Sequence, residues 1–180
     1  MRVLIDACVL YPTVMREVVL GVAQTGLFEA RWSTRILEEW ALAARKIGPE
    51  GEVIARGEMS LLSSRFADAV IPVHPGLEGR LWLPDPADVH VLAAAIAGSC
   101  DMILTMNAKD FPRNILEEEG LSRCDPDGFL RDLLADHPDL VRPVADSVLA
   151  EARRLSGADW TMRALMKKAR LPRFGKALTV

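Results

Sequence analysis

The stretch DPADVHVLAAAIAGSCDMILT, residues 85–105, holds a helix and a strand in succession and decides the fold class. Asp85 suits the N-cap and Pro86 the first helical position, so a helix is predicted to begin there and to continue through VHVLAAAIAG. The apolar run from Met102 to Thr105 is typical of a short buried strand. A helix that leads into a buried strand is the building unit of a parallel sheet covered by helices.

The amino-terminal half repeats this alternation. Val3 to Ile5 form an apolar run that ends at Asp6, as a buried central strand would. A helical pattern follows that Gly26 can end, residues 28–32 alternate like a strand, and another helix runs to about Ile47. Two weaker strand patterns lie further on, at residues 69–73 and 121–124. We therefore predict a three-layer α/β/α fold with a central parallel sheet.

Length and charge predict how the chain is organised. At 180 residues it is long enough for one α/β domain with a small helical addition. The net charge is −3, but residues 151–180 carry eight basic and two acidic side chains, a net +6 that leaves −9 on the rest. From about residue 140 the pattern is helical up to Pro172. We predict one domain over residues 1–135 and a basic helical extension over residues 136–180.

Several classes of protein are not expected. Cys8, Cys100 and Cys124 are widely spaced and form no zinc-binding pattern, which favours a reduced cytoplasmic setting. Asp6 interrupts the first apolar run too early for a signal peptide. No apolar stretch approaches the roughly 18 residues that a membrane-spanning helix needs. We expect a cytoplasmic protein that does not enter the membrane.

Acidic side chains follow the predicted strands. Ligands bind beyond the carboxyl ends of parallel strands, where Asp6, Asn107 and Asp110 are expected. Asp88, in the first turn of its helix, is expected on the same side. On the helix before Ile47, Glu39 flanks the apolar stripe whereas its neighbour Glu38 points away, so Glu39 is the better inward-facing candidate.

Carboxylates gathered in a cleft repel one another unless a divalent cation neutralises them, and oxygen ligands favour Mg²⁺ or Mn²⁺. Such ions activate water for phosphodiester hydrolysis, which is our hypothesis for the chemistry. Simpler interpretations stay open. Asp6 can be a loop hydrogen bonder, Glu39 a solvated helix residue, and Asp88 an acid that stabilises the helix dipole. Asp85 is better explained as an N-cap, Asn107 and Asp110 can form a turn, and His90 is assigned no chemistry.

Four segments in order resemble the motifs of PIN-domain proteins: LIDACVLYP at the amino terminus, SxxxLEE at residues 33–39, LPDPADVHVLAAAIAG at 83–98, and ILTMNAKDFP at 103–112. The resemblance covers roughly residues 1–135. It implies a ribonuclease with an acidic Mg²⁺ or Mn²⁺ site, and many bacterial members resemble VapC toxins of toxin-antitoxin pairs. It also implies an RNA substrate, a cognate antitoxin and a homodimer.

Matching the motifs residue by residue places Asp6, Glu39 and Asp88 on the first three acids, and Asn107 with Asp110 on the fourth. Asn107 departs from the commoner pattern, which has aspartate there, so the resemblance leaves open whether one or two metal ions bind. A second hypothesis is a noncatalytic RNA- or protein-binding PIN module. A third is a phosphate-handling α/β enzyme in which Asp6 is phosphorylated, but the DxD pattern of such enzymes is missing.

The basic extension can contact RNA phosphates and make binding sensitive to salt. A solvated helix surface or an antitoxin-binding face would have the same composition, and the sequence leaves these alternatives open.

Overall fold

The structure is a computed structural model that describes residues 1–72, 74 and 76–179, and its chain falls into two compact units. Residues Met1–Tyr11 and Glu29–Cys124 form the first, which we call the sheet unit. Residues Pro12–Phe28 and Asp125–Val180 form the second, which we call the helical unit. The boundary expected after residue 135 stays a prediction.

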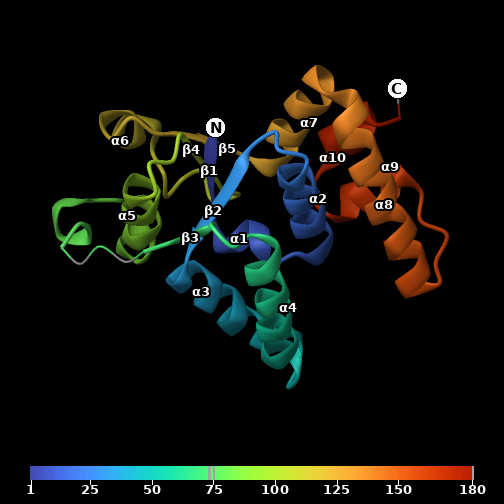
Figure 1. Cartoon of the computed structure of the whole chain (residues 1–180), viewed down its shortest axis with the longest axis horizontal. Helices are drawn as coiled ribbons and strands as arrows, with labels where there is room; N and C mark the ends of the chain where they lie inside the picture. The colour runs from blue at the N-terminus through green and yellow to red at the C-terminus, as the bar shows by residue number, and fades with distance from the viewer. Residues whose placement is uncertain (73, 75, 180) are drawn as a thin grey trace. The chain divides into compact units, whose positions relative to one another are not determined.

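The described part of the sheet unit contains five parallel strands in the order β3-β2-β1-β4-β5 (Figure 1). They are β1 (Arg2–Ile5), β2 (Glu29–Ser33), β3 (Val70–Ile71), β4 (Met102–Leu104) and β5 (Ser122–Cys124). Val3, Leu4 and Ile5 on central β1 are 0% exposed, as a strand covered on both faces requires. The predicted α/β class with a central parallel sheet is confirmed. Of the strand predicted over residues 69–73, Val73 lies outside the described residues.

Helices connect these strands, as parallel pairing demands. The sheet unit contains α1 (Ala7–Leu10), α3 (Thr34–Ala44), α4 (Gly51–Arg65), α5 (Val89–Ala97) and α6 (Arg113–Glu118). Helix α5 packs against β1, β2 and β4, and α3 packs against α4. The Ser33 hydroxyl accepts a hydrogen bond from the Ile36 amide at 3.2 Å, so a side-chain cap begins α3. Asp6, which follows β1, and Asp88, which precedes α5, are thus both positioned by regular secondary structure.

The predicted helix start at Asp85 is confirmed in a tighter form. Oδ1 of Asp85 accepts from the Ala87 amide at 2.9 Å, which is N-cap behaviour. The first turn, Pro86–Asp88, is a 3₁₀ helix, and α5 begins at Val89. Two further 3₁₀ turns occupy Arg45–Ile47 and Glu78–Arg80. Asp85 caps this turn and Asp88 ends it, and a carboxylate oxygen of each lies within 4.8 Å of the other.

The helical unit contains α2 (Thr13–Gln24), α7 (Pro126–Asp136), α8 (Pro138–Ser156), α9 (Met162–Lys168) and α10 (Pro172–Ala177). The prediction of helix up to Pro172 was wrong in two respects. Helix α8 ends before Gly157, which adopts the left-handed conformation at φ 66°. Pro172 begins α10 instead of ending a helix, because proline is well tolerated in the first helical turn.

The hydropathy and length of a helix determine whether it could cross a membrane. Within the described ranges, no helix combines the length and the apolar character needed to cross a bilayer.

Candidate functional site

The carboxylate of Asp6 lies at the carboxyl end of β1, beside the end of the neighbouring strand β4. The backbone amide of Asp6 donates to the carbonyl of Leu104 at 3.1 Å, which continues the pairing of the two strands. The hydroxyl of Thr105 donates to Oδ2 of Asp6 at 2.7 Å, and both residues are buried. A hydroxyl carries no charge, so this hydrogen bond does not neutralise the Asp6 carboxylate, which can still attract a cation.

Cys8 adds a second donor to the same oxygen. Its Sγ donates to Oδ2 of Asp6 at 3.0 Å and accepts from the Met106 amide at 3.3 Å. Burial, and then the Asp6 charge, raise the pKa of the Cys8 thiol to about 12. The thiol is therefore protonated near neutral pH and acts as a hydrogen-bond donor, not as a nucleophile.

Asn107 connects the end of β4 to the acidic groups. Its backbone amide donates to Oγ1 of Thr105 at 3.0 Å. Its side-chain amide donates to Oδ2 of Asp88 at 3.5 Å and also to Oδ2 of Asp110. A neutral amide thus lies between two carboxylates that would otherwise repel each other directly.

Asp85, Asp88 and Asp110 form a group of carboxylates that could hold a metal ion, and we call it the acid cluster. One carboxylate oxygen from each lies within 4.8 Å of the others. Burial, followed by the charges of Asp6, Asp85, Asp110 and Glu39, raises the pKa of Asp88 to about 6. Burial and neighbouring acids thus disfavour ionisation of this carboxyl. A bound divalent cation would favour the ionised form, so this environment is typical of a divalent-cation site.

The donors of the acid cluster fit a hard divalent ion. All three side chains offer carboxylate oxygens, and no sulfur or nitrogen ligand belongs to the cluster as described. An ion such as Mg²⁺ would remove the repulsion that raises the pKa of Asp88.

Glu39 lies outside the acid cluster, on α3. Its Oε1 is 2.7 Å from Nε2 of buried His90 and 3.9 Å from Nε of Arg35. Its charge is nevertheless one of the causes of the raised pKa of Asp88. The structure therefore brings Asp88, Asp110 and Asn107 into direct contact or near contact, and places Asp6 and Glu39 around them.

Three residues of this region were not among the predicted site residues. Asp85 was explained by its N-cap role, although its spacing of three from Asp88 could have placed both acids on one face. Thr105 was assigned to the strand, and no local pattern pairs it with Asp6. His90 was assigned no chemistry; the structure buries it and brings it into contact with Glu39, which no local pattern indicates.

The comparisons with known proteins agree with this geometry. The model of a family described as PIN domain matches residues 2–109, the stretch that carries Asp6, Glu39, Asp88 and Asn107. No curated protein and no solved structure matches the chain. Since the matched stretch makes up more than half of the chain, the protein belongs to the PIN-domain family.

Proposed function

We propose that the protein is a metal-dependent endoribonuclease that hydrolyses RNA phosphodiester bonds. PIN domains are generally nucleases that use divalent metals, which supports the reaction class. The observation that carries the proposal is the acid cluster, in which Asp88 has a pKa raised to about 6. Such a site is prepared for a divalent cation, for which we propose Mg²⁺ or Mn²⁺.

In this proposal Asp88 and Asp110 hold the ion directly, with Asp6 and Glu39 as the outer acids of the site and Asp85 added by the structure. Bound metal supplies an activated water and positive charge against the phosphate oxygens. The chain's own residues orient the ligands. Asn107 fixes the Asp88 and Asp110 carboxylates through its amide, and Thr105 fixes Asp6.

The biological role is proposed from the resemblance to VapC toxins. We assign the protein the role of toxin in a type II toxin-antitoxin pair, acting on RNA in the cytoplasm as a homodimer and inhibited by a cognate antitoxin. A small gene beside the one for this chain, encoding a protein that copurifies with it and blocks cleavage, would support that role.

A noncatalytic PIN module that binds RNA or protein is the second candidate. The observation that favours it is the amide of Asn107, which already donates to two carboxylates of the site. That arrangement partly satisfies the acids without a metal ion and supplies no fourth charge.

Cleavage of a panel of RNAs, structured and single-stranded, by purified protein in Mg²⁺ or Mn²⁺ tests the choice. Asp6→Asn and Asp88→Asn should each lower the rate by about 100-fold or more, as losing a preorganised charged group does. Asp146→Asn is the matched control, because Asp146 is an exposed carboxylate on α8. Intact RNA across the panel, with folded and metal-bound protein, would favour the binding module instead.

A further inference from the structure

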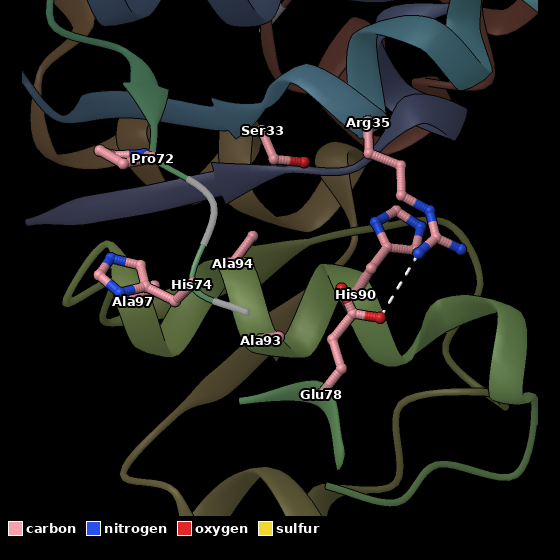
Figure 2. A pocket seen from close by; sticks show the side chains of 9 residues that line it. All are labelled: Ser33, Arg35, Pro72, His74, Glu78, His90, Ala93, Ala94 and Ala97. Carbon is pink, nitrogen blue, oxygen red and sulfur yellow. Dashed lines mark hydrogen bonds and ion pairs between the residues drawn. The ribbon is translucent and has the colours of Figure 1, made fainter. Parts of the chain in front are cut away.

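A pocket opens between α5, the start of α3, and residues Pro72 and His74 after β3. Its cavity volume is about 90 Å³. Figure 2 shows the His90 ring pointing from α5 toward the segment that carries Ser33 and Arg35. The described lining residues are Ser33, Arg35, Pro72, His74, Glu78, His90, Ala93, Ala94 and Ala97. Nothing in the proposed metal chemistry uses this space.

His90 is the feature of the pocket that requires a partner. It is 4% exposed, and among the described residues neither ring nitrogen has a hydrogen-bond partner. Nε2 is 2.7 Å from Oε1 of Glu39, but that contact lacks the alignment of a hydrogen bond. Nδ1 has no hydrogen-bond partner among the described residues. Because buried polar atoms are almost always hydrogen-bonded, this ring nitrogen of a pocket-lining residue is suited to a ligand.

The walls of the pocket exclude a phosphate as its natural occupant. The charged side chains in the lining are Arg35 and Glu78, whose Nη1 and Oε2 lie 3.4 Å apart, so their charges offset each other. Ala93, Ala94 and Ala97 supply a smooth apolar side on α5. An anion gains little here, whereas a flat neutral ring with polar edges gains both burial and hydrogen bonds.

A nucleobase has this chemistry. The edges of bases carry both hydrogen-bond donors and acceptors, so a base can pair with the Nδ1 atom of His90, which does not face Glu39. The Ser33 hydroxyl accepts from the Ile36 amide, which leaves its own proton free to donate. Sequence-specific RNA recognition takes bases that are splayed out of a single strand into such sites.

The 3₁₀ turn that carries Asp88 leads directly into α5, whose residues His90, Ala93, Ala94 and Ala97 line the pocket. Asp88 lies in that turn, and His90 follows two residues later and contacts Glu39, whose charge acts on Asp88. We propose that this pocket binds one base of the RNA strand, next to the phosphodiester bond that the acid cluster cleaves. The identification of the strand as RNA rests on the proposed function.

The test uses metal-free protein and small probes, so it does not depend on cleavage. Protein with ¹³C-labelled alanine methyl groups is titrated with each of the four ribonucleosides, with ribose and with inorganic phosphate. At least one nucleoside should shift the methyl signals of Ala93, Ala94 and Ala97 in a saturable way, with a dissociation constant on the order of 1 mM. Ribose and phosphate should leave those signals in place.

Ala94→Leu fills the pocket from a helix that tolerates leucine, and should weaken nucleoside binding by about tenfold or more. Ala97→Leu, at the half-buried edge, is the second variant if the first does not fold. Ala150→Leu is the matched control, because Ala150 is exposed on α8 and outside the pocket. Binding in the control should equal that of the unaltered protein.

The proposal is overturned if no nucleoside shifts the three methyl signals, or if ribose or phosphate shifts them equally. It is also overturned if folded Ala94→Leu protein binds nucleosides as the unaltered protein does. These outcomes are separate from failure of the nuclease, since a protein that cleaves no RNA still passes or fails the titration.

Discussion

Oγ1 of Thr105 lies 2.7 Å from Oδ2 of Asp6, so the residue after β4 holds the carboxylate after β1. The same hydroxyl oxygen accepts from the Asn107 amide at 3.0 Å. One buried side chain therefore links the first acid of the site to the loop that carries the last. Strand pairing alone would leave both segments near each other but would not fix their side chains.

Thr105→Val removes this link while keeping the shape of the side chain. It removes the acceptor of the Asn107 amide and one of the two side-chain donors to Asp6, the other being the Cys8 thiol, which should lower the free energy of unfolding by about 1–3 kcal/mol. Mn²⁺ affinity should fall about tenfold, as it does when a partner that orients a ligand is lost. Calorimetry and Mn²⁺ titration measure the two effects. Thr105→Ser keeps the hydroxyl and should bind Mn²⁺ normally; equal affinity in the valine variant would refute the orienting role.

The raised pKa of Asp88 predicts a pH-dependent stability of metal-free protein. The unfolded chain has a pKa near 3.8 for this carboxyl and the folded chain about 6, so folding favours the protonated form. The contribution of Asp88 to stability should therefore fall as pH rises from about 4 to about 6, where this carboxyl retains in the folded protein a proton that it has lost in the unfolded chain.

Asp88→Asn removes the free-energy cost of ionising this carboxyl in the folded protein. Above pH 6 its metal-free form should be more stable than the unaltered protein by about 1 kcal/mol after allowance for solvent screening, a rise of roughly 2–4 °C in midpoint. The advantage should vanish near pH 4. Thermal unfolding in EDTA across this range measures it, and a constant difference at every pH would contradict the assignment.

Asn107→Asp tests the departure from the commoner motif. The variant replaces a neutral amide beside Asp88 and Asp110 with a fourth carboxylate. Mn²⁺ affinity should rise about tenfold because affinity follows the charge of the ligand set, while metal-free stability should fall because of added repulsion. Titration calorimetry with Mn²⁺ decides it. Unchanged affinity and unchanged metal-free stability together would show that Asn107 lies apart from the ion.

Asp127 in the helical unit is an acid with a purely structural role. It is 6% exposed and accepts from Nε of Arg173 at 3.0 Å and from the Phe174 amide at 2.8 Å. Asp127→Asn should lower the free energy of unfolding by about 3 kcal/mol, because it removes the charge of a buried carboxylate that accepts from two backbone amides and from half-exposed Arg173, and it brings in a misplaced amide donor. The unfolding midpoint should drop by roughly 6–12 °C. Asp146→Asn, at an exposed position, is the control, and an equal midpoint in both variants would count against this role.

Much of the sheet was predictable because it depends on short-range patterns. The apolar runs of β1 and β4 end in polar residues, and the Asp85-Pro86 pair marks a helix start. These local signals were enough to predict a parallel α/β fold and to place Asp6 and Asp88 at one edge of the sheet.

The contacts that complete the site were not predictable in this way. Thr105 and Asp6 are 99 residues apart, and a threonine at the end of a strand carries no sign of its partner. Asp85 already had a role as an N-cap, which concealed its place in the acid cluster. The helical angle predicted that Glu39 faces inward, but only the fold shows that Glu39 meets His90.

In the proposed function, the acid cluster binds the divalent ion on which cleavage depends. The number of Mn²⁺ ions bound per chain, measured from the electron paramagnetic resonance signal of free Mn²⁺, tests this binding in the unaltered protein, in Asp88→Asn and in Asp146→Asn. We predict saturable binding of at least one ion by the unaltered protein and by Asp146→Asn, and affinity lower by about 100-fold in Asp88→Asn. Equal Mn²⁺ binding by all three proteins would contradict the account.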